Sequence, residues 1–346
     1  MSVTIKDIAR LAGVSIATVS KVVNNKDFDI SEGTRVRVQK IIDEENYRPN
    51  SLARSMITKT TKTVGLIIPD VRNPFFTDLA RGAEDCAKEN GYSLLFCNSD
   101  DVLEKEIEYI NTLVEKQVDG IVLAGSINRN KALEEKYSVT VPIVSLDRKV
   151  YFKGIQATVE IDNVTGAHDA IEYLIQSGHK DILFLSGQEE VDISKDRLIG
   201  YKKALEENHI PFNPKSVIFG LYKSEFGYQY IMENDLPKEV TAIFCGNDLI
   251  ALGVIKALKS KKIKVPKDIS IMGFDDISLA SINTPELTTV KQPSYEFGYI
   301  AVQRLIDIIE GITNRKDKFE IKTELIIRES TAPRRNDTKS DDDVAE

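Results

Sequence analysis

The apolar residues at the start of the chain recur at the spacing of short amphipathic helices. A first stripe falls at positions i, i+3, i+4 and i+7 and consists of Ile5, Ile8, Ala9 and Ala12. Thr4 can cap this helix, and Gly13 can end it because glycine readily adopts a positive φ. Ser15 is a suitable N-cap for a second helix over residues 16–23, and a third helix is predicted to begin near Ser31. The pattern predicts a small all-α head.

The outward face of the second predicted helix carries small and hydroxylated residues and one cation, namely Ala17, Thr18, Ser20 and Lys21. Small side chains let a helix approach a groove closely, hydroxyls can contact phosphates, and a lysine can reach the acceptors of guanine. This face indicates a helix-turn-helix that reads DNA. The alternative is a helical hairpin that only caps a larger domain. Residues 50–56 are compatible with a helix too short to be stable alone, so we expect it to order only on binding.

From residue 63 to about residue 328 short apolar runs alternate with amphipathic helices. This alternation favours parallel sheet covered by helices on both faces, and so many strands are more readily divided between two sheets than held in one. The predicted strands are 64–69, 93–97, 120–124, 143–146, 182–186, 242–245 and 269–274, and helices include 76–90, 104–116, 163–177, 197–208 and 249–259.

Polar and aromatic residues follow several of these strands. Ligands of open α/β sheets bind beyond the carboxyl ends of the strands, which here are followed by residues 70–76, Asp147-Arg148, Asn247-Asp248 and Asp275-Asp276. Carboxylates, amides and guanidinium groups beside aromatic rings suit a polyol, so we expect a sugar or sugar-derived effector. Each residue also has a structural alternative: an aspartate can cap a helix, Phe75 and Phe76 can be core, and Asp147-Arg148 can be an interlobe ion pair.

Charge is divided unevenly along the chain. Residues 1–62 hold 11 Lys and Arg against 7 Asp and Glu, a net charge of +4, whereas the remainder holds 35 against 47, a net charge of −12. A basic head on an acidic body concentrates affinity for DNA in the head. With 346 residues and 42% apolar content, the chain can bury a full core in a large body beside that head.

Several classes of protein are not expected. The sequence has no apolar run of membrane-spanning length and no secretion signal, so we expect a cytoplasmic protein with no membrane partner. Its three cysteines lack metal-site spacing, and no catalytic or nucleotide-binding motif is present. None of the three histidines stands at a diagnostic spacing. We therefore predict no enzyme, no cofactor, no metal site and no catalytic residue.

The chain resembles the LacI/GalR family of bacterial transcription regulators in TIKDIARLAGVSIATVSKVVN, NYRPNSLARSM, VDGIVL, IDNVTGA, GHKDILFLSG, RLIGYKKAL, GNDLIALG and GFDD. The resemblance implies that Ile16, Ala17 and Lys21 face base edges in the major groove. It places Thr4, Ser15, Thr18, Ser20, Asn24 and Arg35 near phosphates. It further implies a hinge helix in the minor groove containing Asn50, Leu52, Ala53, Arg54 and Met56, with Met56 where the family usually has a wedging leucine.

For the body, the resemblance implies two Rossmann-like lobes with three crossovers, as in periplasmic sugar-binding proteins. The predicted domains are a helix-turn-helix domain over 1–48, a hinge and linker over 49–62, an effector-binding and dimerisation domain over 63–333 and a disordered tail over 334–346. Lobe one is expected over about 63–159 and 292–320, and lobe two over about 160–291 and 321–333. The effector candidates are Asn73, Phe75, Phe76, Asp147, Arg148, Arg197, Tyr222, Asn247, Asp248 and Asp275.

The expected protein is a homodimer that binds a near-palindromic double-stranded operator as a repressor and changes its affinity when a sugar binds between the lobes. A sugar that tightens binding would instead make it a corepressor-dependent regulator. Other classes are a cytosolic sugar-binding module or transport receptor, and an α/β enzyme. Within the family, residues 295–298 and Arg304 partly resemble the helix on which a phosphorylated carrier protein docks in catabolite regulators, although Gln303 differs.

Overall fold

The computed structural model describes residues 3–48, 60–126, 138–150, 152–313 and 318–334. The predicted hinge residues 50–56 and all but the first residue of the predicted tail lie outside these ranges. The chain divides between Thr61 and Lys62 into two compact units.

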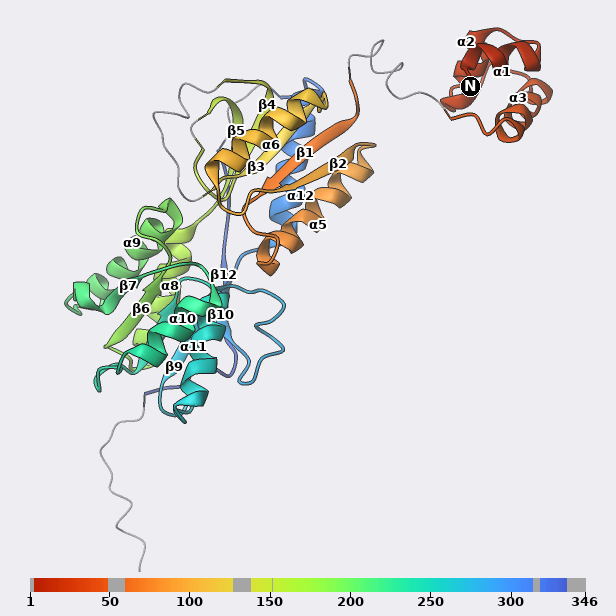
Figure 1. Ribbon diagram of the computed structural model, residues 1–346. Helices are drawn as coiled ribbons and strands as arrows, with labels where there is room; N and C mark the ends of the chain where they lie inside the picture. Colours follow the sequence, from red (N-terminus) through yellow and green to blue (C-terminus); the bar gives the residue numbers. More distant parts are fainter. Residues whose placement is uncertain (1–2, 49–59, 127–137, 151, 314–317, 335–346) are drawn as a thin grey trace, which may run out of the picture. The chain divides into compact units, whose positions relative to one another are not determined.

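The first unit is a bundle of three helices, α1 (Ile5–Ala12), α2 (Ile16–Val23) and α3 (Glu32–Glu44) (Figure 1). Its core consists of Ile8, Ala9, Ala12, Val19, Val22 and Val38. Gly13 ends α1 with a φ of 64°, which lets α2 start three residues later. Ser15 and Ser31 cap α2 and α3 through their hydroxyls.

The second unit contains two six-stranded sheets, each in the order expected of a doubly wound fold. The first sheet has the order β11-β5-β4-β3-β1-β2 and is parallel throughout. The second has the order β12-β10-β9-β8-β6-β7, in which only the β10–β12 pairing is antiparallel. The chain crosses from one sheet to the other three times, after β5, after β10 and after β11. The predicted fold class, an all-α head and a two-lobed α/β body, is confirmed.

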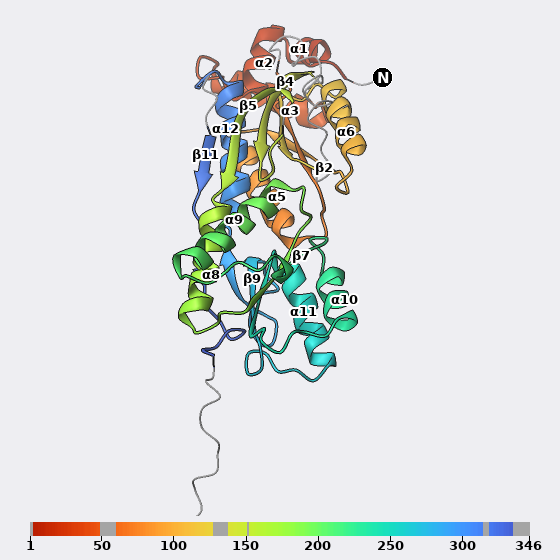
Figure 2. The ribbon, with the colours of Figure 1, turned by 90° about the vertical axis from the view of Figure 1, so that its left-hand side faces the viewer.

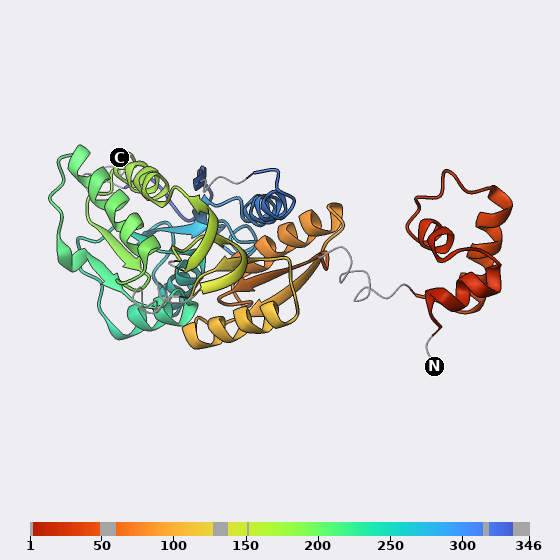
Figure 3. The same cartoon turned by 90° about the horizontal axis from the view of Figure 1, so that it is seen from above.

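The first lobe carries helices on both faces of its sheet. Helices α5 and α12 pack together over one face and α6 covers the other, as the orange, blue and gold helices of Figure 3 show. The elements of this lobe are β1 (Thr63–Ile68), α5 (Pro74–Glu89), β2 (Ser93–Asn98), α6 (Leu103–Glu115), β3 (Gly120–Ala124), β4 (Ser138–Leu146), β5 (Lys153–Ile161), α12 (Ser294–Ile309) and β11 (Lys318–Ile321).

The second lobe is built in the same way. Helices α8 and α9 lie side by side on one face of its sheet, and α10 and α11 lie on the opposite face (Figure 2). Its elements are α8 (Asn163–Gln176), β6 (Ile182–Ser186), α9 (Asp192–Glu207), the 3-10 helix η1 (Pro214–Ser216), β7 (Val217–Phe219), α10 (Ser224–Glu233), β8 (Ala242–Cys245), α11 (Asp248–Ser260), β9 (Ser270–Asp275), β10 (Thr288–Lys291) and β12 (Glu324–Ile326).

One predicted helix start is wrong. The sequence places the start of a helix at Arg197, but α9 begins at Asp192 after Val191, which has no capping side chain. Arg197 therefore lies in the second turn of α9, and its side chain is directed into the lobe rather than outward from a helix end. Within the described ranges, no helix is long and apolar enough to span a lipid bilayer.

Candidate functional site

The predicted DNA-facing residues of the head lie on its solvent side. Ile16, Ala17 and Lys21 of α2 are exposed, with Ile16 at 44% of its full accessibility, while Val19 and Val22 of the same helix are buried in the core. Thr18 and Ser20 are half-buried, and Thr4, Ser15, Asn24 and Arg35 are exposed. The helix period thus separates a core face from a face that is free to enter a groove.

Two of the predicted phosphate contacts are helix caps. The Thr4 backbone N–H donates to Oδ2 of Asp7 at 3.1 Å, and the Asp7 N–H donates back to the Thr4 hydroxyl at 3.4 Å. Ser15 Oγ accepts from the backbone N–H of Thr18 at 3.1 Å. The start of a helix presents unpaired N–H groups and positive potential, which favour a phosphate. The predicted hinge contacts Asn50, Leu52, Ala53, Arg54 and Met56 lie outside the described residues.

Both cations of the predicted interface that lie in the head are paired with acids of the loop between α2 and α3. Lys21 Nζ binds Oδ2 of Asp29, and Arg35 Nε lies 3.9 Å from Oδ2 of Asp27. The Lys21 ammonium lowers the pKa of Asp29, mainly through its hydrogen bond. These two acids were not among the predicted site residues.

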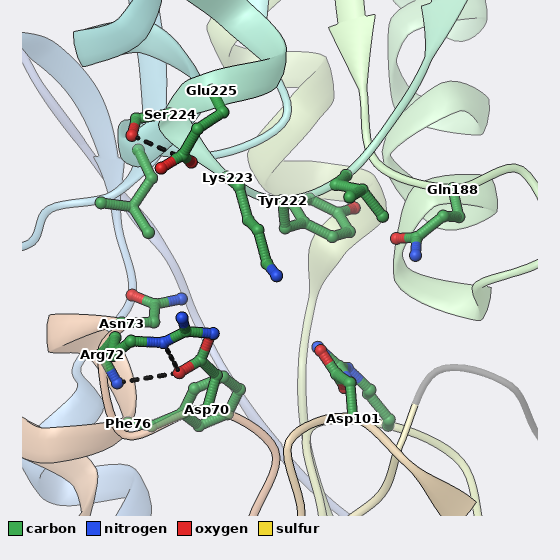
Figure 4. Close-up of a pocket in the computed structure, with 13 residues that line it drawn as sticks. Asp70, Arg72, Asn73, Phe76, Asp101, Gln188, Tyr222, Lys223, Ser224 and Glu225 are labelled. Carbon is green, nitrogen blue, oxygen red and sulfur yellow. Dashed lines mark hydrogen bonds and ion pairs between the residues drawn. The ribbon is translucent and has the colours of Figure 1, made fainter.

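The body contains a cleft into which strand ends of both sheets project. Its wider part has a volume of about 350 Å³ and is shown in Figure 4. A narrower part of about 30 Å³ shares Asn73, Phe76, Arg148 and Tyr222 with it. The wider part is further lined by Asp70, Arg72, Asp101, Gln188, Leu221, Lys223, Ser224, Glu225 and Leu249, and the narrower part by Phe75, Asp147, Ile193, Arg197, Asn247, Asp275 and Gln292.

Arg197 is the best anchored side chain of the cleft. It is 1% exposed, its Nε donates to Oδ1 of Asn163 at 2.9 Å, and its Nη1 donates to the carbonyl of Gly246. Its guanidinium carbon lies 3.6 Å from the centre of the Phe274 ring, and Nη2 lies 3.9 Å from Oδ1 of Asp275. A guanidinium held on one edge and one face presents its remaining N–H groups in a fixed direction.

Asp275 ends β9 with a φ of 121°, which carries the chain out of the sheet at the cleft. Its Oδ1 accepts from Nε2 of Gln292 at 2.5 Å, and the side chain is buried. Burial raises the pKa of Asp275 to about 7, although the nearby Arg197 guanidinium opposes this rise. The amide oxygen of Gln292, Oε1, is buried without a hydrogen-bond partner. This oxygen could accept a hydrogen bond from a donor group of a ligand.

Arg148 and Asp147 form the opposite wall. Nη1 of Arg148 donates to Oδ1 of Asp101 at 2.5 Å and to the carbonyl of Gly125 at 3.0 Å, whereas its buried Nε makes no hydrogen bond. Asp147 has a φ of 65°, and burial raises the pKa of its carboxyl. Two carboxyl groups and two guanidiniums therefore meet in the narrow part, and this set of hydrogen-bond acceptors and donors suits a ligand rich in hydroxyls.

The aromatic candidates have different surroundings. Phe76 lines both parts of the cleft, and its ring centre lies 5.9 Å from the Arg148 guanidinium. Phe75 belongs to the core of the first lobe, where it meets Phe76 edge-to-face at 5.0 Å, and it lines only the narrow part. Tyr222 lines both parts, with its hydroxyl 2.8 Å from that of Ser194, and burial raises its pKa.

Asp248 is the one predicted effector residue that the structure does not bring to the cleft. Asn247, just before it, lines the cleft and caps α11 by accepting from the N–H of Ile250 at 2.9 Å. Asp248 is fully buried in the second lobe and accepts from the N–H of Ile277 at 2.9 Å and from the hydroxyl of Thr289 at 2.5 Å. Burial and the charge of Asp275 raise its pKa. It ties α11 to β10 and to the chain after β9.

Sequence reasoning missed six polar residues of the cleft, namely Asp101, Gln188, Lys223, Ser224, Glu225 and Gln292. Gln292 follows β10 directly, so the strand-end rule would have found it had that short strand been predicted. Lys223 follows β7 and precedes α10, and both elements are short. Among the described residues, no group of His, Cys, Asp or Glu side chains could hold a metal ion.

Comparison with known proteins gives consistent matches over the chain. Residues 4–50 match the family model for bacterial regulatory proteins of the lacI family, and residues 171–331 match that for a periplasmic binding protein-like domain. The chain is 40% identical to the HTH-type transcriptional regulator RegA of Clostridium saccharobutylicum, over 96% of the chain and 100% of that relative. It is 38% identical to catabolite control protein A of Priestia megaterium, over 96% of the chain and 100% of that relative. The solved lac repressor dimer bound to operator and the anti-inducer ONPF aligns with a TM-score of 0.83 and 27% identity, covering 96% of this chain and 100% of that chain.

Proposed function

This chain belongs to the lacI family of bacterial regulatory proteins and is a DNA-binding transcriptional repressor with an effector-binding body, and we propose how its own residues perform these two tasks. The exposed face of α2 enters the major groove, with Ile16, Ala17 and Lys21 against base edges. Thr4, Ser15, Thr18, Ser20, Asn24 and Arg35 contact the phosphates on either side. Two chains pair, so that two heads meet the two halves of a near-palindromic operator.

The effector is a sugar held in the cleft between the lobes. The observation that carries this proposal is the pairing of Asp147 and Asp275 with Arg148 and Arg197 around buried amides, because hydroxyl groups can donate to the carboxylates and accept from the guanidiniums. Phe76 and Tyr222 offer apolar faces for the C–H surface of the ring. A ligand that contacts both lobes favours one lobe arrangement and thereby changes operator affinity.

A thermal-shift screen of sugars and sugar phosphates against the full chain tests this assignment. A neutral sugar is expected to raise the melting temperature of the wild type and to lose this effect in Asp275→Asn, which keeps the shape of the side chain but removes its charge. Asp235→Asn, a change at a fully exposed acid, is the matched control and should retain the effect. A sugar that stabilises Asp275→Asn as much as the wild type would place the effector elsewhere.

The segment over residues 50–56 serves as a hinge helix that folds on the operator, and Met56 wedges into the central base step. Helix content measured by circular dichroism should rise when operator is added to the full chain. The rise should be smaller in a chain that lacks residues 50–56. An equal rise in both chains would remove the hinge from the mechanism.

A second candidate partner is a phosphorylated carrier protein that docks on α12. Two observations favour it: the 38% identity to catabolite control protein A and the half-exposed tyrosines of this helix. Tyr295 and Tyr299 donate to Asp85 and Glu89 of α5 at 3.1 and 2.7 Å, and Arg304 stacks on Phe319. Titration calorimetry with a phosphorylated carrier should give binding that Arg304→Ala weakens. Absence of binding to the wild type would leave the sugar as the sole signal.

A further inference from the structure

The loop between α2 and α3 places an acid against each of the two cations that are proposed to face DNA. Lys21 of α2 is bound by Asp29, and Arg35 of α3 lies 3.9 Å from Asp27. The two cations come from different helices, whereas the two acids are separated by a single residue. The side chain between them, Phe28, is 93% exposed and therefore packs against nothing in the head.

The loop holds its shape by backbone bonds that do not involve these carboxylates. The N–H of Lys26 donates to the carbonyl of Lys21 at 2.9 Å, and the N–H of Ile30 donates to the carbonyl of Asp27 at 2.9 Å. Asn25 takes the left-handed conformation with a φ of 53°. Because these bonds and the half-buried Ile30 already fix the turn, the acids are available for a role in binding.

The cation of each ion pair is exposed enough to reach a phosphate. The side chains of Lys21 and Asp29 are 46% and 52% exposed, whereas Arg35 is 53% exposed and Asp27 only 19%. A phosphate that approaches either cation must displace the carboxylate or tolerate its negative charge nearby. Such a pair neutralises less phosphate charge than a free cation does, so it contributes less to counterion release.

We propose that Asp29 is a specificity-determining residue of the head and that Asp27 limits the affinity of the head for phosphate, because they hold Lys21 and Arg35 in ion pairs that DNA must displace. On a random duplex, Lys21 exchanges one carboxylate for one phosphate and gains little. On the operator, Lys21 also gains hydrogen bonds to the acceptors of a guanine. These bonds outweigh the cost of breaking its ion pair with Asp29. Asp29 thus lowers binding to random DNA more than binding to the operator, whereas Asp27, whose partner Arg35 meets phosphate on either duplex, lowers binding to both. This inference rests on the proposed DNA-binding face.

The test compares full-length variants on a short duplex of scrambled sequence by fluorescence anisotropy across a series of salt concentrations. The double variant Asp27→Asn/Asp29→Asn should bind this duplex about threefold to tenfold more tightly than the wild type. The slope of log affinity against log salt should steepen by one to about two, because two further cations become free for phosphates. Each single variant should show part of the change.

The matched control is Glu44→Gln/Glu45→Gln, which alters the head by the same charge at the far end of α3. Among the described residues, Glu44 forms an ion pair with Lys40 at 3.7 Å, so its removal frees neither Lys21 nor Arg35. The control should leave the slope unchanged and alter affinity by less than about twofold. Far-ultraviolet circular dichroism verifies that the variants keep their helices. If the double variant unfolds, the same measurements are made on the single variants Asp27→Asn and Asp29→Asn.

Equal affinities and slopes for the two double variants would overturn the role of the acids while leaving DNA binding intact. A wild type that fails to bind duplex at low salt while the Asp27→Asn/Asp29→Asn variant binds would support the inference. Failure of every variant, at low salt, would overturn both the inference and the DNA-binding face on which it rests.

Discussion

At the scale of single residues, the cleft depends on buried charges that are held by specific partners. Arg197 is tied to Asn163, Gly246 and Phe274, and Asp275 is tied to Gln292. Burying a charge without partners costs several kcal/mol, so these contacts are needed for the ligand-free cleft to exist at all. They also hold the guanidinium and the carboxylate in place before a ligand arrives.

Asp275 should make the stability of the body depend on pH. Burial raises the pKa of this carboxyl from 3.8 to about 7, so the folded state holds its proton over a range where the unfolded chain has lost it. The free energy of unfolding should therefore fall as the pH rises from about 4 to about 7. Above pH 7 the titration of Asp275 should change it little further. Asp275→Asn removes this dependence and should give a flatter curve of melting temperature against pH.

The control for this measurement is Asp235→Asn, an exposed acid for which the curve should keep the wild-type slope. Parallel curves for the wild type and Asp275→Asn would mean that Asp275 titrates near its ordinary value.

Position after a strand predicts most residues of the cleft but cannot decide between neighbours. Asn247 and Asp248 both follow β8, yet only Asn247 lines the cleft. The reason is that α11 begins there, and consecutive helical residues point about 100° apart, so the carboxylate of Asp248 turns into the lobe. The position of Arg197 is mispredicted for a different reason. The start of α9 carries no capping side chain, so the sequence does not mark where that helix begins.

At the scale of elements, close helix packing in the first lobe depends on glycine. A Cβ atom built on Gly82 of α5 would lie 1.9 Å from the backbone oxygen of Tyr295 in α12, and one on Gly298 would lie 1.9 Å from that of Leu79. These paired glycines let α5 and α12 approach and align the N-terminus of α5, which carries Asn73 and Phe76 into the cleft.

Gly82→Ala should destabilise the body by about 1 to 3 kcal/mol, because backbone rather than a flexible side chain blocks the new methyl group. The body transition in a thermal scan should move down by several degrees. Gly33→Ala in α3 is the contrasting change, since no atom lies within 4 Å of its Cβ position. It should stabilise the head by up to about 1 kcal/mol. Equal effects of the two substitutions would contradict the packing argument.

The long elements could be predicted from hydrophobic periodicity, and the short ones could not. Strands of five or six buried residues such as β1, β3 and β6 stand out as apolar runs. Strand β12 has three residues and no fully buried one, and β7 is equally short, so neither carries a periodic signal. Lys223, which follows β7, is missed for the same reason.

At the scale of the whole molecule, the chain combines a head that binds DNA with a two-lobed body that binds an effector. The chain passes between the two sheets after β5, after β10 and after β11, so three segments connect the lobes. Multiple connections restrict lobe motion to hinge or shear displacements, which are suited to transmitting a small change at the cleft. A coupling of about 1 to 3 kcal/mol would change operator affinity roughly five- to 150-fold.

The most direct measurement is selection of duplexes from a random library by the full chain, followed by titration of the enriched sequence with and without the sugar found in the thermal-shift screen. We expect a near-palindromic sequence to be enriched and bound much more tightly than scrambled duplex. We also expect its affinity to change on adding the sugar in the wild type and not in Asp275→Asn. Enrichment of no inverted repeat over random DNA would contradict the account.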